Sequence, residues 1–187
     1  MVYMPRLKCL TVWIGSQVLL AGAVLLGAVG AAAQTAKVGK IDPTWLRADA
    51  ASKTVEFKLV AGLTDNNGGM SFNGFSRGGL VLTVPHAWNV VLHFKNEDPN
   101  LPHSVEIIPD AAAIPTGPVP PAFEHAASGQ LEQGLSGGQG SDIRFVAGKD
   151  GSFLIFCAVP GHGAAGMWVR LAVSDADKPA LAAAAER

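Results

Sequence analysis

The sequence is poor in cysteine, and its two cysteines lie far apart. Cys9 and Cys157 are separated by most of the 187-residue chain. Two thiols cannot form the disulfide framework of a small secreted scaffold, and they cannot supply a four-thiolate zinc site. Both of these cysteine-rich classes are therefore excluded.

Charge is also scarce, and neither sign dominates. Charged residues make up 16% of the chain, with 14 Lys and Arg against 15 Asp and Glu. A protein that binds nucleic acid through its phosphates needs a basic face or stripe. The balance gives no support for such a binder, so we expect no nucleic-acid partner.

Apolar residues are abundant, at 49%, and many of them lie at the N-terminus. Arg6 and Lys8 precede an apolar run over 9–29, and small residues follow up to Ala33. This order is typical of a secretory signal, so residues 1–33 predict export and a periplasmic or other extracytoplasmic location. The run also approaches the ~20 residues that span a bilayer, so a retained anchor, tethering the protein to the membrane, stays open as an alternative.

Loss of the signal leaves Cys157 as the only cysteine of an exported protein. In an oxidising compartment an unpaired thiol is exposed to oxidation or to wrong pairing. Such a thiol persists if it pairs between chains, is buried, or binds a metal.

Short segments rich in β-branched and aromatic residues recur after residue 53. Clusters of Gly, Asn, Asp and Pro separate them, a pattern that predicts an all-β sandwich or barrel. Alternation is clearest over 88–95, where Val90, Leu92 and Phe94 share one face. The predicted strands are 55–60, 80–84, 89–95, 103–108, 142–146, 152–158 and 167–173.

These segments predict a single domain over 53–174, preceded by an extension over 34–52 and followed by a tail over 175–187. A long connection rich in Pro and Gly lies at 109–141, and loops of this length are usually functional or mobile. Only the tail segment 178–186 favours a helix, because of its alanines.

The residues that point to chemistry lie between the last two predicted strands. Cys157, His162 and Met167 follow one another at intervals of five residues, and His103 begins an earlier strand. Two imidazoles, a thiolate and a weak axial thioether are the ligands of a blue-copper electron-transfer site. Soft sulfur suits Cu(I) and nitrogen suits Cu(II), so this set accommodates both oxidation states.

Each residue alone has an ordinary explanation: methionine fills cores, and a lone cysteine behaves as a buried hydrophobe. Their joint spacing in an exported β protein favours a metal. Zinc is a rival ion, although structural zinc sites prefer four Cys or His ligands. A Cys–His nucleophile is a second rival. That reading leaves Met167 unexplained and lacks an orienting carboxylate or amide.

The string Cys157-x-x-Pro160-Gly161-His162-x-x-x-Gly166-Met167, with His103-Ser104 upstream, resembles the cupredoxins of the sulfocyanin and rusticyanin branch. The resemblance covers roughly residues 53–174. It implies a Greek-key β-sandwich of the cupredoxin type. It also implies one type 1 copper per chain, bound by His103, Cys157, His162 and Met167.

The same resemblance implies an electron carrier and not an enzyme. We expect a monomer that docks transiently with redox proteins such as a c-type cytochrome or a terminal oxidase. A copper carrier or storage protein with the same ligands is the alternative. His86 and His93 are interpreted as structural or surface residues. His125 is expected to be exposed, with an auxiliary copper site as the alternative.

Overall fold

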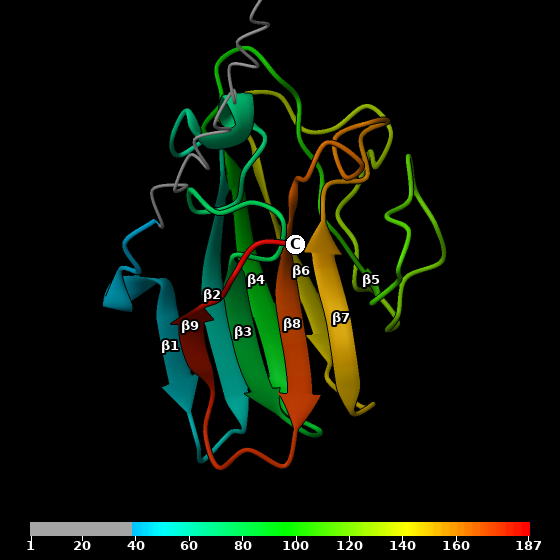
Figure 1. Cartoon of the computed structure of the whole chain (residues 1–187). Coiled ribbons are helices and arrows are strands. Elements are labelled where there is room, and N and C mark those ends of the chain that lie inside the picture. The colour runs from blue at the N-terminus through cyan, green and yellow to red at the C-terminus, as the bar shows by residue number, and fades with distance from the viewer. Residues whose placement is uncertain (1–38) are drawn as a thin grey trace, which may run out of the picture. The chain divides into compact units, whose positions relative to one another are not determined.

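The computed structural model describes residues 39–187, which are built almost entirely from strands (Figure 1). The export segment and the alternative anchor, both expected within residues 1–33, lie outside the described residues. Within 39–187, no helix is long and apolar enough to cross a bilayer. The elements are the short 3-10 segments η1 (Pro43–Trp45) and η2 (Asn66–Gly69), and the strands β1 (Leu46–Asp49), β2 (Thr54–Ala61), β3 (Leu80–Pro85), β4 (Asn89–Asn96), β5 (Glu106–Pro109), β6 (Gly140–Val146), β7 (Gly151–Phe156), β8 (Trp168–Ser174) and β9 (Ala180–Ala183).

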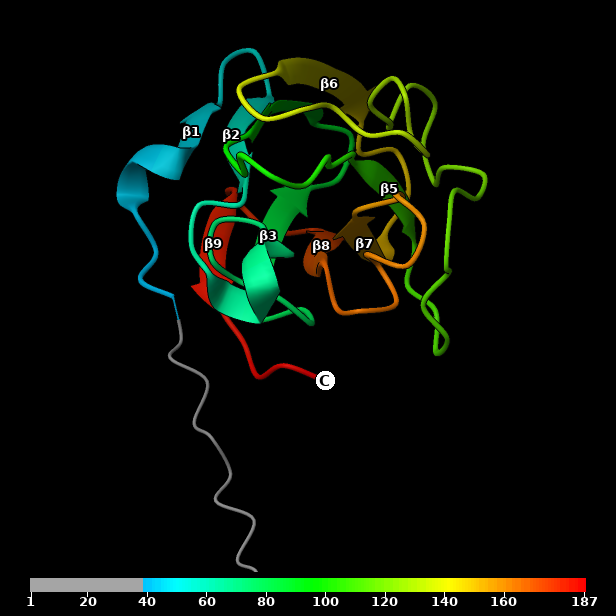
Figure 2. The ribbon, with the colours of Figure 1, turned by 90° about the horizontal axis from the view of Figure 1, so that it is seen from above.

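The strands form two sheets that pack face to face. One sheet has the order β1-β2-β4-β6 and the other has the order β5-β7-β8-β3-β9. From β2 to β7, successive strands alternate between the sheets, and β2–β4 and β3–β8 pair in parallel. Figure 2 shows the two layers end-on. The expected all-β sandwich is confirmed.

The core between the sheets follows from the period of two along each strand. In β2 every second side chain is buried, so Val55, Phe57 and Leu59 point inward. Leu80 and Leu82 of β3 enter the same apolar cluster from the opposite sheet. Burial of each such side chain stabilises the fold by about 1.5–3 kcal/mol.

A second, smaller apolar cluster lies on the outer face of β5, β7 and β8. Loop 110–139, which connects β5 to β6 along one side of the sandwich, covers this face (Figure 2). The cluster consists of Ile108, Leu154, Phe156, Ala158 and Trp168, with Ile114, Val119 and Leu131 packed against it. The long connection expected at 109–141 is therefore a packed cover, and its two ends belong to β5 and β6.

The tail differs from its expected helical preference. Ala180–Ala183 form β9, which pairs antiparallel with β3. The helix preference of alanine amounts to a few tenths of a kcal/mol over most residues. It is outweighed by four paired positions along β3 and by packing of Leu181 against the core.

The expected domain limits of 53 and 174 are too narrow. β1 lies before residue 53 and pairs with β2, while β9 lies after residue 174 and pairs with β3. β1 and β9 are edge strands of the two sheets, so the folded domain begins before residue 53 and ends after residue 174. The strand expected over 103–108 begins only at Glu106, because His103 turns away to form an isolated bridge with Leu135.

Candidate metal centre

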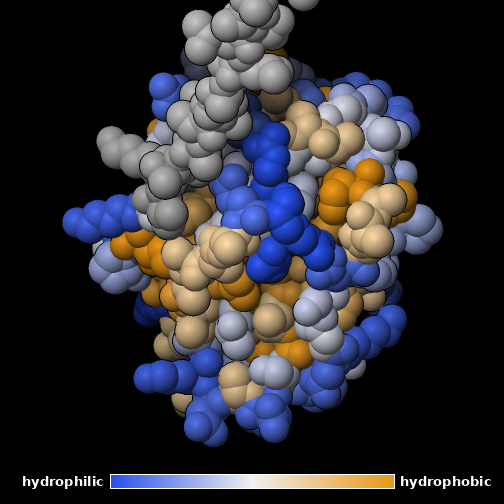
Figure 3. All heavy atoms as spheres, viewed as in Figure 1, coloured by the Kyte–Doolittle hydropathy of each residue, from blue (hydrophilic) through white to orange (hydrophobic). Residues whose placement is uncertain are grey.

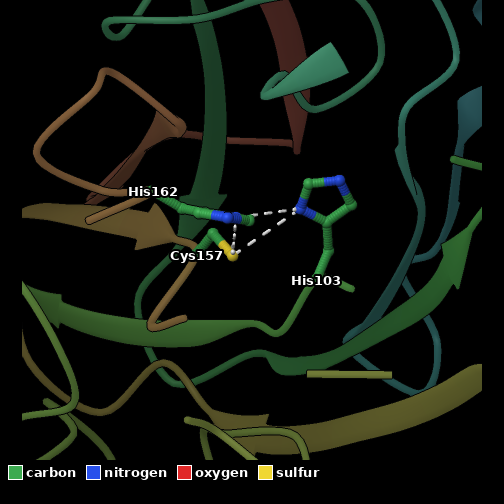
Figure 4. A group of neighbouring side chains, drawn as sticks. All are labelled: His103, Cys157 and His162. Atoms are coloured by element: carbon green, nitrogen blue, oxygen red, sulfur yellow. Dashed lines mark hydrogen bonds between the residues drawn. The ribbon is translucent and has the colours of Figure 1, made fainter. Parts of the chain in front are cut away.

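Three of the four predicted ligands meet at one end of the sandwich. His103 precedes β5, Cys157 directly follows β7, and His162 lies in the loop between β7 and β8. Their side chains converge (Figure 4). The Nδ1 atoms of the two histidines are 3.3 Å apart, and Cys157 Sγ lies 3.9 Å from His103 Nδ1 and 3.6 Å from His162 Nδ1.

This triangle has the size that a bound metal requires. Bonds of about 2.0–2.1 Å to nitrogen and about 2.3 Å to sulfur, spread at about 120°, place the donor atoms about 3.5–3.8 Å apart. The three observed separations are 3.3, 3.6 and 3.9 Å, so a point about 2.1 Å from every donor lies in their plane. Two imidazole nitrogens and one sulfur therefore fit a trigonal metal without rearrangement.

Met167, the fourth predicted ligand, lies at the end of the same loop and is fully buried. Its N–H donates to the His162 carbonyl at 3.0 Å, and its carbonyl accepts from the Cys157 N–H at 3.0 Å. These two hydrogen bonds hold Met167 beside both residues. Gly166, with a φ of 106°, makes the turn that leads into it.

Burial of the donor side chains affects their protonation and therefore their ability to bind a cation. His103 and Cys157 have no exposed surface, and His162 is half-buried. Desolvation lowers the pKa of His103 and of His162, so both rings favour the neutral form that coordinates metals. Desolvation also raises the pKa of the Cys157 thiol, and a coordinated cation displaces that proton.

Asp98 faces the side of the His103 ring that points away from the other donors. Its Oδ2 lies 3.5 Å from His103 Nε2, while its Oδ1 accepts the N–H groups of Asn100 and Leu101. Burial alone would raise the pKa of Asp98, but these hydrogen bonds and the His103 ring outweigh it and lower the pKa. We infer that the carboxylate holds the proton on Nε2 and leaves the Nδ1 lone pair free for metal.

Replacing Asp98 by asparagine is therefore expected to weaken metal binding by about 10–100-fold. The new amide oxygen must still accept from Asn100 and Leu101, so its NH2 group faces Nε2 and favours the wrong tautomer of His103. A chelator competition titration measures the affinity, and nitrogen NMR reports the tautomer in the metal-free protein.

The matched control for this prediction is Asp142→Asn. Asp142 lies on β6 and pairs with His93 Nδ1 at 2.8 Å, outside the metal centre. It should leave affinity unchanged. An Asp98→Asn protein with wild-type affinity and an Nε2 proton would contradict the role inferred for Asp98.

Ser104 supports the sulfur of Cys157. Its backbone N–H donates to Sγ at 3.4 Å, and its hydroxyl donates to the Leu131 carbonyl while accepting the Ala158 N–H. Because Leu131 belongs to loop 110–139, Ser104 links this loop to the segment that carries Cys157.

The remaining histidines do not join the centre. His86 pairs with Asp150 and His93 with Asp142, each at 2.8 Å, and His125 lies 3.4 Å from Glu124. All three pairs are substantially exposed, as expected for surface residues. In the part of the chain that the structure describes, only His103, Cys157 and His162 bring three such ligand atoms within 4.8 Å of one another.

The sequence gives weak signals for two buried acids near the centre. Asp98 stands in a turn five residues before His103, and nothing in the local sequence distinguishes it from an ordinary turn residue. Glu106 alternates with the core residues Val105 and Ile107, so its side chain points beneath loop 110–139. There one carboxylate oxygen accepts the Val119 N–H at 3.2 Å, and the other has no protein partner.

Comparison with known protein families identifies the family to which the chain belongs. The family model for the sulfocyanin (SoxE) domain matches residues 42–179, which is most of the chain. The chain belongs to the sulfocyanin family. Homologous cupredoxins bind one copper ion, and the trigonal donor set found here fits that metal.

One relative of this sulfocyanin-family chain is the sulfocyanin of Sulfolobus acidocaldarius. The two are 27% identical over an alignment of 136 residues, and the match covers 66% of this chain and 65% of the relative. The match therefore spans slightly less than two thirds of the relative's own length.

Two solved structures are similar to this chain to different degrees. A methionine-to-glutamine variant of rusticyanin is 21% identical, with a TM-score of 0.51 over 73% of this chain and 86% of that one. The auracyanin of Roseiflexus castenholzii, in its reduced form, is 24% identical, with a TM-score of 0.46 over 65% and 97% of the two chains. The rusticyanin likeness confirms that this sandwich is of the cupredoxin type.

Proposed function

We propose that this chain is an exported single-electron carrier whose one type 1 copper is bound by His103, Cys157, His162 and Met167. The observation that carries the proposal is the donor triangle, which already has the size a metal needs. Copper, when bound, supplies the one-electron couple. Because the donors need not move far, a change of oxidation state requires little reorganisation of the protein.

The four ligands have different tasks in this proposal. Cys157 supplies the soft donor that Cu(I) prefers, and the Ser104 N–H orients its sulfur. His103 is fixed from behind by Asp98 and is closed to solvent. Met167 supplies the weak axial contact, and His162 is the ligand nearest to solvent.

The surroundings of His162 support transient docking of a redox partner. Pro160, Gly161 and Ala164 are exposed, and no charged residue occurs over 157–168. The Gly161 N–H donates to the carbonyl of Thr116, so an uncharged part of loop 110–139 adjoins this surface. In Figure 3, apolar atoms gather on the upper right, where these two loops lie in Figure 1.

A surface of this kind suits a small, short-lived interface, which is typical of electron-transfer encounters. The partner classes that we propose are a c-type cytochrome and a terminal oxidase, met by a monomer. Export to the periplasm, or retention there by an uncleaved membrane tether, is part of the proposal and depends on residues 1–33.

A copper carrier or storage protein is the alternative. It would need a metal that exchanges readily, whereas two of the donors here are fully buried. Burial of His103 and Cys157 therefore favours the electron carrier.

One set of measurements tests both functions. The purified protein with Cu(II) is expected to develop an intense visible thiolate-to-copper band that ascorbate bleaches. Stopped-flow mixing with a c-type cytochrome then measures electron transfer, and a chelator measures copper exchange. Rapid transfer with slow exchange is the expected result. A colourless Cu(II) complex would refute the blue-copper site, and fast exchange with slow transfer would favour the carrier.

A further inference from the structure

The loop between β7 and β8 carries three of the proposed ligands, Cys157, His162 and Met167, and a segment distant in sequence binds it from outside. Segment 62–79 connects β2 to β3 and passes along this loop. The Arg77 N–H donates to the Gly166 carbonyl at 2.8 Å, and the Gly78 N–H donates to the Trp168 carbonyl at 3.0 Å. These backbone bonds bracket Met167.

The side chain of Arg77 adds a further hydrogen bond to this loop at Ala165, which lies between His162 and Met167. Arg77 Nη2 donates to the Ala165 carbonyl at 3.0 Å, and Arg77 Nη1 donates to Asn67 Oδ1 at 3.1 Å. Asn67 Nδ2 donates to the same Ala165 carbonyl at 3.2 Å and to the Met70 carbonyl at 2.8 Å. One carbonyl of the ligand loop thus receives two side-chain donors that also bind each other.

The backbone at the contact between Arg77, Asn67 and the β7–β8 loop is conformationally constrained. Arg77 and Asn67 have φ values of 44° and 52°, in the left-handed region that residues other than glycine rarely adopt. A Cβ on Gly166 would lie 2.8 Å from Arg77 Cγ, so only glycine allows the arginine stem to approach this closely. Such unfavourable conformations persist when the surrounding contacts over-determine them, often at functional sites.

We propose that Arg77, together with Asn67, is a positioning clamp that fixes the His162–Met167 half of the metal centre. The proposal rests on the copper site proposed above. It gives a positioning role to two residues whose side-chain hydrogen bonds go to Ala165, to Met70 and to each other. Without the clamp, the Ala165 carbonyl loses both donors and the loop can shift. The axial contact of Met167 and the angle of the His162 ring then vary.

The central variant is Arg77→Met, which keeps much of the stem and removes every guanidinium donor. Arg77→Lys keeps the charge but loses the planar fork that reaches Asn67 and Ala165 together. Asn67→Ala removes the second donor to Ala165. The matched control is Arg170→Met, because Arg170 also lies against Gly78 but its guanidinium donates to Ala185, outside the loop.

The first readout is hydrogen exchange in the metal-free protein. We expect the amides of Gly166 and Met167 to exchange about tenfold faster in Arg77→Met than in Arg170→Met, which is the effect of losing one charge-assisted hydrogen bond. Arg77→Lys and Asn67→Ala should show smaller increases in the same amides. These two milder variants keep the test valid if Arg77→Met does not fold.

The second readout uses the copper-loaded protein. Arg77→Met should release copper to a chelator about tenfold faster and should change the shape of its copper EPR signal, while Arg170→Met retains the wild-type signal. Unchanged exchange at Gly166 and Met167 in all three clamp variants would overturn the clamp, whatever metal binds. Absence of the visible band in the wild type would instead refute the blue-copper site. Amide hydrogen exchange in the metal-free variants would still show whether Arg77 and Asn67 hold the loop.

Discussion

Replacing Cys157 by serine is expected to abolish the visible thiolate-to-copper band completely. The band requires a sulfur ligand, and Cys157 is the only cysteine within residues 39–187. A hydroxyl is also a poor ligand for Cu(I), which prefers soft sulfur. Loss of an outer partner of a ligand costs about 10–100-fold in affinity, so loss of the ligand itself should exceed that range. Visible absorption and chelator competition measure the two effects.

Serine is close to cysteine in size, so the metal-free variant should keep the fold. Near-identical thermal unfolding of the two metal-free proteins would show that the loss is local to the centre. Cys9→Ser in the full chain is the matched control, since it makes the same change at the other cysteine and should leave the band intact. A visible band of wild-type intensity in Cys157→Ser would rule out this thiol as the copper ligand.

The second large effect concerns the buried carboxyl of Glu106 and its response to pH. Burial beneath loop 110–139 raises the pKa of Glu106, and the single hydrogen bond from the Val119 N–H opposes this only in part. In the unfolded chain the carboxyl is hydrated and titrates near its ordinary pKa. The folded state therefore binds this proton more tightly than the unfolded state does.

The direction of the effect follows from that difference. Stabilisation by protonated Glu106 is complete below the ordinary carboxyl pKa and is lost as the pH rises through the raised pKa of the folded protein. Between these two values the free energy of unfolding falls by up to about 1.4 kcal/mol per pH unit for this one proton. Glu106→Gln cannot ionise, so its stability should not show this fall.

Urea unfolding of the metal-free proteins over a series of pH values measures the difference. Relative to the wild type, Glu106→Gln should gain stability as the pH rises. Glu124→Gln, at an exposed position of the same loop, should follow the wild type at every pH. Parallel curves for Glu106→Gln and the wild type would contradict a raised pKa.

Local pattern and short motifs predicted much of this protein. Alternation places Val90, Leu92 and Phe94 on the buried face of β4, and the period of two holds because side chains in a strand point to opposite faces. The spacing of Cys157 and His162 was sufficient to predict their convergence, because both lie on one short loop. His103 was a candidate by its residue type and its place at a strand start, but its approach to Cys157 depends on the pairing of β5 with β7, which no local pattern predicts.

The features that sequence did not reveal depend on contacts between distant segments. β9 forms because β3 offers a free edge, and alanine propensity contains no information about that edge. Asp98 and Arg77 acquire their roles only when folding brings them to His103 and to Ala165. No local period distinguishes such residues from ordinary turn residues.

The alternation of strands between the sheets also has a consequence for when the metal can enter. His103 and Cys157 are 54 positions apart, and they meet only after β5 has paired with β7. Closing such a long connection and pairing strands that are distant in sequence are slow steps of folding. A nascent chain therefore has no complete copper site to offer. Loading of the complete site is therefore a late event in the folding of this chain.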